Sequence, residues 1–300
     1  MSLQPAQLDA LVAVVEQGTF DAAARKLHVT PSAVSQRIRA LESTAGQVLV
    51  QRSIPCRATP AGETLLRLAR QIRLLHDEAD RALASDPHRV VDLPIAVNAD
   101  TLATWLRPVL HEVGAWEGAA LRLHVEDQAF SADLLRRGEV LAAVTSDPSP
   151  VQGCVVERLG TLRYTPAAAP GFAERWRRGR GYDWARMPTV VFNEKDALQH
   201  DALAARGVTA PPPVVHRVPT SHDFHEAVRA GLGWGAIPDP QLLPDVESGR
   251  LVVLAPRQHV DVELHWQRWR LDSPALDRLS TLVRRAAHAG LRRRSAAQGS

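Results

Sequence analysis

Residues 19–42 constrain the fold more than any other stretch, because they predict two short helices joined by a tight turn. In the segment TFDAAARKLHVTPSAVSQRIRALE, apolar residues recur at helical spacing on either side of a break at His28. Thr30 is a suitable N-cap, since its hydroxyl can accept an unpaired backbone N–H, and Pro31 suits the first helical position, where no amide donor is needed. The inner face of the second helix is then Val34, Ile38 and Leu41. This arrangement predicts a helix-turn-helix.

The outer face of the second predicted helix carries side chains of the kinds that bind DNA. Glutamine can pair with the edge of adenine and arginine with that of guanine, and hydroxyls and arginines also contact phosphates. A short β-hairpin, or wing, is predicted over residues 48–57. From Phe20 to Ala58 the chain has six basic residues against two acidic ones, a local excess that favours a phosphate backbone. The predicted DNA contacts are Thr30, Pro31, Ser32, Ser35, Gln36, Arg37, Arg39, Arg52 and Arg57.

A second Thr-Pro pair, at Thr59 and Pro60, predicts a long helix that ends near Ala84. Its apolar residues alternate spacings of four and three, which is typical of a coiled-coil seam. We therefore predict a dimerisation helix with Leu65, Leu68, Ile72, Leu75 and Ala79 in its seam. The outer side would carry Arg67, Arg70, Arg73, Asp77, Glu78 and Arg81. The alternative is an amphipathic helix that packs on its own domain.

Beyond this helix, strands and helices alternate, which predicts parallel sheets flanked by helices. Expected strands include residues 93–97, 121–126, 140–145, 154–163, 189–192 and 260–269. Expected helices include residues 102–113, 196–206, 222–230 and 274–289, and the stretches 165–170 and 210–213 are expected to be loops. The resulting division is a DNA-binding domain over residues 1–58, a linker helix over 59–86 and a third domain over 91–300.

Length and composition favour a multi-domain, cytoplasmic protein that is not an enzyme. The chain has 300 residues, enough for two or three domains, and its apolar content of 45% is ordinary for a globular protein. The sequence has neither a membrane-length apolar run nor a signal peptide at its start. It also lacks G-x-S-x-G, a P-loop and H-E-x-x-H, and the glycine-rich segment at 231–235 follows a helix rather than a strand.

In the order of its parts, the chain resembles the LysR-type transcriptional regulators. The shared features are a first helix, the helix-turn-helix TPSAVSQRIRALE, a wing, and ATPAG leading into a long helix. The later segments VNADTLATW, VEDQ, AVTSDP, GLGWGAIP and WQRWRLDSP are similar to the ArgP/LysG branch of that family. One departure is Val50, where many members have phenylalanine in the wing.

The resemblance implies an α+β multi-domain protein. Its parts would be a winged helix-turn-helix, a coiled-coil linker helix and an effector domain of two α/β subdomains that resembles a periplasmic binding protein. Subdomain I would cover about 91–162 plus 268–300, and subdomain II about 163–267, with the ligand between them. The implied partners are double-stranded DNA, L-lysine or L-arginine, RNA polymerase and further copies of the chain, as a dimer or a dimer of dimers. The gene controlled would be a basic amino-acid exporter. A two-fold dimer predicts an interrupted inverted repeat as the DNA site.

Polar residues gather where predicted strands end or helices begin, which is where α/β sheets bind ligands. A basic ligand also requires an acid, and Asp196 is one candidate; Asp127 is another, although it can instead lie at a subunit contact. For Asp100, Asp196 and Asp223 the alternative is a helix cap. The predicted ligand residues are Asn98, Asp100, Thr101, Asp127, Thr145, Ser146, Asp147, Glu194, Thr220, Ser221 and Asp223. Alanine at Asp100 or Asp147 is expected to abolish the response to basic amino acids while leaving DNA binding intact.

The sequence also allows several alternatives. The spacing of His222 and His225 allows a metal site, and Cys56 and Cys154 allow redox sensing, but neither a metal nor another cofactor is expected. A LysR-type regulator of a different small molecule is one alternative function. An architectural or replication-origin DNA-binding protein without an effector is another, against which the large α/β half argues.

Overall fold

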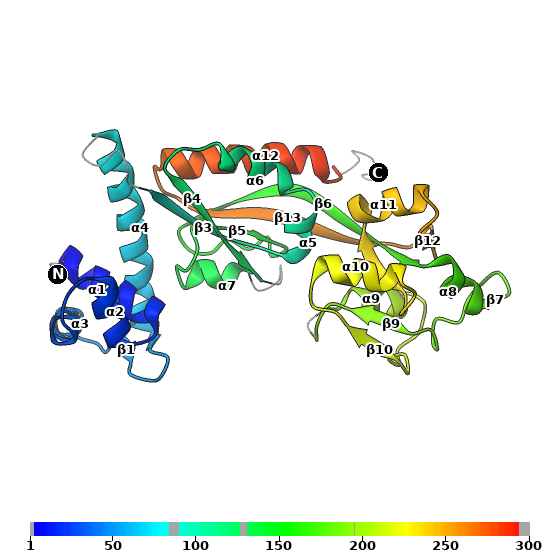
Figure 1. Cartoon of the computed structure of the whole chain (residues 1–300), viewed down its shortest axis with the longest axis horizontal. Coiled ribbons are helices and arrows are strands. Elements are labelled where there is room, and N and C mark those ends of the chain that lie inside the picture. Colours follow the sequence, from blue (N-terminus) through cyan, green and yellow to red (C-terminus); the bar gives the residue numbers. More distant parts are fainter. Residues whose placement is uncertain (1–2, 84–89, 127–130, 195, 294–300) are drawn as a thin grey trace.

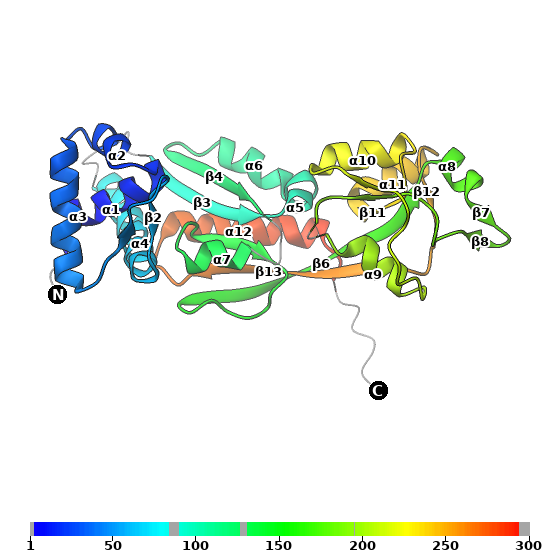
Figure 2. The ribbon, with the colours of Figure 1, turned by 90° about the horizontal axis from the view of Figure 1, so that it is seen from below.

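The protein consists of a small helical domain, a single long helix and an elongated two-lobed α/β domain, arranged in a row (Figures 1 and 2). This computed structural model describes residues 3–83, 90–126, 131–194 and 196–293. The predicted ligand residue Asp127 lies outside these ranges. No helix in the described ranges is long and apolar enough to cross a membrane.

The N-terminal domain is the predicted winged helix-turn-helix. It contains α1 (Pro5–Gln17), α2 (Phe20–Lys26), α3 (Pro31–Ala45) and a hairpin of β1 (Val50–Gln51) and β2 (Arg57–Ala58). Thr30 caps α3 by accepting the N–H of Ala33 at 3.2 Å. Gly18 ends α1 with a φ of 72°, a backbone conformation that favours glycine. The inner face of α3 is fully buried, as its spacing predicts.

Helix α4 (Pro60–Ala82) has an exposed apolar stripe, which begins later than the sequence predicts. Leu68, Ile72 and Leu75 are 36%, 41% and 39% exposed, and Ala79 is exposed with them. Leu65 is only 8% exposed and belongs to the core of the winged-helix domain. Its prediction as a seam residue is therefore wrong, because the first turns of α4 pack against α1 of their own domain.

The charged side of α4 faces the C-terminal domain, so the prediction that it lies on the outside is also wrong. Arg67 and Arg70 donate hydrogen bonds to the carbonyl oxygens of Arg136 and Gly138, at 3.1 and 2.9 Å. Gly138 has a φ of +65°, and a Cβ atom there would lie 2.5 Å from the Cα of Arg67. The close approach of α4 thus requires glycine at this position.

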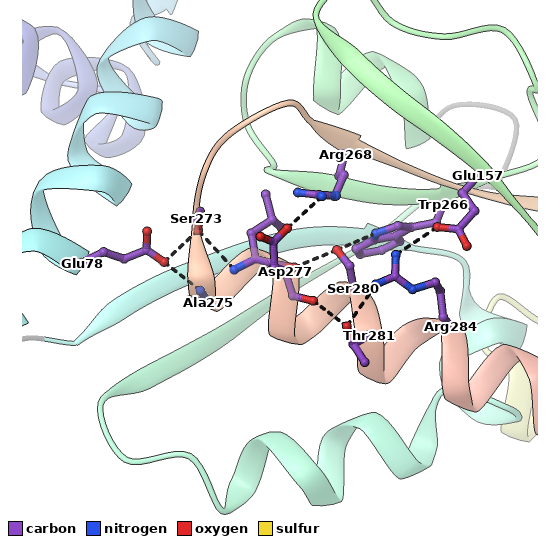
Figure 3. Close-up of polar contacts among 11 residues, drawn as sticks. Glu78, Glu157, Trp266, Arg268, Ser273, Ala275, Asp277, Ser280, Thr281 and Arg284 are labelled. Atoms are coloured by element: carbon purple, nitrogen blue, oxygen red, sulfur yellow. Dashed lines mark hydrogen bonds and ion pairs between the residues drawn. The ribbon is translucent and has the colours of Figure 1, made fainter. Parts of the chain in front are cut away.

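Glu78 attaches the far end of α4 to α12 (Pro274–Gly290), as Figure 3 shows. One carboxylate oxygen accepts the hydroxyl of Ser273 at 2.7 Å and the backbone N–H of Ala275 at 2.9 Å. Ser273 in turn accepts the N–H of Leu276 at 3.2 Å. A carboxylate at a helix N-terminus is favourable, because it meets unpaired N–H groups and the positive end of the helix dipole. Helix α4 is therefore fixed to the C-terminal domain at both ends of its charged side.

The C-terminal domain is organised by one mixed sheet rather than by the predicted parallel sheets. The strands are β3 (Val91–Val97), β4 (Ala119–Val125), β5 (Ala142–Thr145), β6 (Cys154–Ala168), β11 (Gly235–Pro238), β12 (Val252–Val253) and β13 (Val260–Trp269). Their order is β11-β6-β13-β5-β3-β4, with β12 also on β6. Strands β3, β4 and β5 are parallel, whereas β6 and β13 are antiparallel to their neighbours. Residues 165–168, predicted as loop, extend β6 because β11 and β12 pair with them.

Subdomain I packs helices on both faces of β3, β4 and β5 (Figure 1). They are α5 (Ala99–Ala103), α6 (Arg107–Gly114), α7 (Ser131–Arg136) and α12. The single helix predicted at 102–113 is in fact two, because Thr104 has a non-helical ψ of −104°. The core between the sheet and α12 includes Trp105 and Trp266, and the indole N–H of Trp266 donates to Ser280 at 3.1 Å (Figure 3).

Subdomain II surrounds the far ends of β6 and β13 (Figure 2). It contains α8 (Pro170–Arg175), β7 (Arg177–Arg178), β8 (Gly181–Tyr182), β9 (Thr189–Val191), α9 (Leu198–Ala204), β10 (Val215–Arg217), α10 (Ser221–Arg229) and α11 (Asp239–Glu247). Helix α11 is absent from the sequence prediction. Strand β13 changes register between Leu264 and His265 and pairs with β5 from His265 onward. It thus enters subdomain I before the predicted boundary at 268.

Acid is expected to loosen the contact between the winged-helix domain and α4. Glu16 on α1 accepts a hydrogen bond from Lys26 at 2.8 Å and lies 3.6 Å from Arg70. Burial raises the pKa of Glu16, but the Lys26 hydrogen bond and the charges of Lys26, Arg70 and Arg73 outweigh it, so its pKa is lowered. The stabilisation is therefore complete above the unfolded pKa of about 4.3 and is lost as the pH falls through the folded pKa.

Urea unfolding of wild type and Glu16→Gln checks this expectation. At pH 7 the variant should lose about 1 kcal/mol of unfolding free energy, and the difference should shrink towards pH 4 and below. Glu174→Gln is the matched control, since the Glu174 carboxylate is 67% exposed. A gap between Glu16→Gln and wild type that stays constant with pH would contradict the assignment.

Candidate DNA-binding and ligand-binding sites

Helix α3 presents a polar surface that suits the major groove of DNA. Thr30, Pro31, Ser32, Gln36 and Arg39 are exposed on it. The other two predicted contacts on this helix, Ser35 and Arg37, are half-buried. The buried inner face holds the helix on α1 and α2, which leaves the outer face free to enter the groove.

Two further arginines flank α3 on the wing. Arg52 lies over the ring of Phe20, with its Cζ 5.3 Å from the ring centroid, and Arg57 is exposed on β2. The wing is tied to α3 because Glu42 accepts the N–H of Leu49 at 2.9 Å. Within the described chain, neither arginine forms an ion pair with a carboxylate, so both charges are available to phosphates.

A cavity of about 630 Å³ lies between subdomains I and II, bounded by residues from both ends of the central sheet. Of the predicted ligand residues, Asn98, Asp100 and Ser146 line it, as does the candidate acid Asp196. The charged side chains of its described lining are all carboxylates: Asp100, Glu126, Asp196, Asp201, Asp261 and Glu263. Such a lining attracts a cation.

Asp100 joins the two subdomains at the edge of this cavity. Its carboxylate accepts the hydroxyl of Tyr164 at 3.0 Å and that of Ser221 at 2.7 Å. Tyr164 lies on β6 and Ser221 on α10, so the bonds connect α5 to both. Burial and the charge of Asp100 raise the pKa of Tyr164 well above its usual range, which keeps the phenol protonated as a donor. The N-cap of α5 is instead Asn98, which accepts the N–H of Thr101 at 3.0 Å.

Two other candidate acids, Asp196 and Asp223, form hydrogen bonds at the starts of α9 and α10, although the N-cap positions themselves are Ala197 and Thr220. Asp196 accepts the N–H groups of Phe192 and Leu198, at 2.8 and 3.1 Å, before α9. Asp223 binds the hydroxyl of Thr220, which itself caps α10, and neither residue lines the cavity. Asp196, in contrast, lines the cavity.

The remaining predicted ligand residues lie outside the cavity lining. Asp147 accepts the N–H of Ser149 at 2.9 Å, which lowers the pKa of its carboxyl, and it lies 3.8 Å from Arg136. The lining also leaves out Thr101, Thr145, Glu194 and Ser221, although Ser221 reaches Asp100 through its hydrogen bond. Asp100 and Asp147 were both predicted to be needed for the response to basic amino acids, but only Asp100 lines the cavity.

Sequence reasoning missed several lining residues, and Gln199 on α9 is the most informative of them. Its side chain is 2% exposed, and neither of its amide atoms has a hydrogen-bond partner among the described residues. The sequence gives a weak signal for this residue, because Gln199 lies on the same buried face of α9 as Ala202 and Leu203. A glutamine on an apolar helical face requires an explanation. Asp261 and Glu263 gave no such signal, since they alternate along β13 like ordinary solvent-facing residues.

A larger cavity, of about 940 Å³, lies between the winged-helix domain, α4 and the sheet. It has charges of both signs, and several of these pair with each other: Glu16 with Lys26, and Asp92 with Arg122 and Arg73. This cavity therefore lacks the uniform charge of the one between the subdomains, and we take the latter as the ligand site.

The metal and redox alternatives receive no support from the geometry. His225 lies 2.8 Å from the buried carboxylate of Asp245, and the described residues contain no group of three or more potential ligands arranged around a metal. Cys56 and Cys154 are both buried free thiols. Burial raises the pKa of Cys154 to about 12, which holds it in the unreactive thiol form.

Comparison with known proteins identifies both halves of this architecture. Residues 5–63 match the bacterial regulatory helix-turn-helix proteins of the lysR family, and residues 92–288 match the LysR substrate binding domain. The chain belongs to the LysR family. A LysR-family relative, the lysine export transcriptional regulatory protein LysG of Corynebacterium glutamicum, is 44% identical over 97% of this chain and 100% of its own length.

Two solved LysR-family structures are similar over almost the whole chain. ArgP from Mycobacterium tuberculosis has a TM-score of 0.87 at 44% identity and covers 98% of this chain and 100% of its own. Full-length LysG from Corynebacterium glutamicum with bound effector Arg has a TM-score of 0.81 at 43% identity, covering 96% and 99%. In this LysR-family chain the acidic cavity lies within the matched substrate binding domain.

Proposed function

We propose that this LysR-family transcriptional regulator binds L-lysine or L-arginine between its two subdomains and controls a gene for basic amino-acid export. The observation that carries the proposal is the acidic lining of the cavity. A lysine or arginine side chain brings a permanent cation, and carboxylates at short range stabilise it strongly where water is partly excluded. An acidic or neutral amino acid lacks this side-chain cation and would gain less from these groups.

The named relatives support this choice of effector. LysG is named for lysine export, and its solved structure holds arginine as effector. Asp261 and Glu263 are paired with Arg163 and Arg158 at 2.7 Å, which neutralises part of the lining charge at β13. Asp100, on the opposite subdomain, accepts the hydroxyls of Tyr164 and Ser221, and its carboxylate adds negative charge to that side of the cavity.

DNA binding completes the proposed mechanism. Two copies pair through the exposed stripe of α4, and each inserts one α3 into an adjacent major groove of an interrupted inverted repeat. Two such dimers can assemble into a dimer of dimers, and RNA polymerase is a further partner. The proposed location is the cytoplasm, where the chromosome lies. The effector bridges the subdomains, and α4 transmits the change through the bonds of Arg67, Arg70 and Glu78.

Thermal unfolding with a panel of amino acids tests the proposed effector. L-lysine or L-arginine at a hundred times its dissociation constant should stabilise the protein by about 2.7 kcal/mol and raise the melting temperature by several degrees. L-citrulline, L-leucine and L-glutamate at the same concentration should leave it unchanged. A shift with L-glutamate, or with none of the five, would refute the proposal.

A further inference from the structure

The side chain of Gln199 occupies an unusual position in the cavity wall. It is almost fully buried, it lines the cavity, and its Oε1 and Nε2 are both without a hydrogen-bond partner among the described residues. Helix α9 holds it against the central sheet at β6, β11 and β13. The amide is therefore fixed in place by the fold, while its two hydrogen-bonding groups remain unused.

An unused buried amide destabilises the free protein. Buried polar groups are almost always hydrogen-bonded, because removing them from water without a new partner is unfavourable. An apolar side chain of similar volume would suit the buried face of α9 better, next to Ala202 and Leu203. The unpaired amide of Gln199 is explained if its hydrogen-bond partner is a ligand that enters the cavity. The free energy lost by burying the amide is then recovered when the ligand binds.

The charge of the cavity indicates which part of the ligand Gln199 binds. The carboxylates of the lining suit a cationic side chain, but they repel the α-carboxylate of the same amino acid. A carboxylate in such surroundings requires uncharged N–H donors, and Nε2 of Gln199 offers two. The carbonyl Oε1 of the same amide can accept from the neighbouring α-ammonium group.

We propose that Gln199 binds the α-carboxylate of the effector and makes the site select basic amino acids over the corresponding amines. This inference rests on the proposed function, because it assumes that a basic amino acid is the ligand. Within that function it assigns a specificity-determining role to a residue that contributes no charge.

Calorimetric titration of the full chain with L-arginine and with agmatine, its decarboxylated form, tests the assignment. Wild type should bind L-arginine more tightly than agmatine. In Gln199→Met, which keeps the length of the side chain but removes both hydrogen-bonding groups, L-arginine binding should weaken about tenfold to a hundredfold. Agmatine should lose much less, so that the preference for the amino acid falls by about tenfold.

Two control measurements separate a role in binding from a role in the core. The ligand-free Gln199→Met protein should melt at the same temperature as wild type or higher, because the unpaired amide is gone. Gln199→Glu, which has nearly the same shape, should weaken L-arginine binding by charge repulsion but leave agmatine binding equal or tighter.

Unchanged L-arginine affinity in Gln199→Met, an equal loss for L-arginine and agmatine, or a lower melting temperature of the ligand-free variant would each overturn the role of Gln199. Failure of wild type to bind either L-lysine or L-arginine would overturn the proposed function, and this inference with it.

Discussion

The Ile72→Asp variant is expected to be a folded monomer that binds DNA about a hundredfold more weakly than wild type. Ile72 lies in the middle of the exposed stripe of α4, between Leu68 and Leu75, and is 41% exposed in the single chain. In a two-fold coiled coil the same position on both helices meets at the seam. Two unpaired carboxylates there would cost about 3 kcal/mol or more, enough to dissociate a dimer at micromolar concentration. A monomer reaches only one half-site and loses the gain from joining two.

Light scattering after size exclusion measures the mass of this variant, and fluorescence anisotropy measures its affinity for DNA. The matched control is Val214→Asp, which places the same charge at an apolar residue that is 43% exposed and directly precedes β10, a strand that Figure 1 shows far from α4. The control should keep the mass and DNA affinity of wild type. Unchanged assembly and affinity in Ile72→Asp would show that the stripe on α4 is not the dimer seam.

The second large effect is expected at Asp100. In Asp100→Ala, the buried hydroxyl of Tyr164 loses its acceptor and Ser221 loses its bond across the subdomains. We expect a loss of about 1–3 kcal/mol in unfolding free energy. The affinity for L-lysine and L-arginine should fall at least about tenfold, because a cavity carboxylate is gone and the subdomains are no longer held together on that side. DNA affinity without effector should remain.

Asp147→Ala is the matched control for this prediction. Sequence alone assigns Asp147 the same role as Asp100, whereas the structure places it outside the cavity in a turn with Ser149. Its loss should leave the effector affinity within about twofold of wild type. Calorimetric titration of both variants decides between the two assignments. An unchanged affinity in Asp100→Ala, or an equal loss in both variants, would contradict the site described here.

Local signals explain why the winged-helix domain could be predicted closely from the sequence. Thr30 and Pro31 fix the start of α3 by chemistry within one turn, and the buried stripe of α3 follows a helical period. The apolar stripe of α4 was visible for the same reason. The contacts on the other side of α4 could not be predicted in this way. Arg67 and Arg70 bind backbone carbonyl oxygens, which are present in every residue and leave no signal in the sequence.

The ligand site was predicted only in part, for a related reason. Asn98 and Asp100 lie at the start of a helix after a strand, where ligands of α/β folds are expected, and both line the cavity. Asp261 and Glu263 come from β13, which reaches the cavity only because the long antiparallel strands β6 and β13 pass from one subdomain to the other. A parallel-sheet expectation cannot bring those residues to the site. Gln199 is evident only once its burial and its unused amide are known.

A basic amino acid in the acidic cavity is expected to change how the winged-helix domains engage DNA. Fluorescence anisotropy of the full-length protein on the promoter region beside its own gene tests this most directly, with L-arginine, L-lysine or L-glutamate added at the same ionic strength. L-arginine or L-lysine should change the DNA affinity at least about threefold in either direction, and L-glutamate should not. The same affinity in all conditions, measured with folded dimeric protein, would contradict the claim.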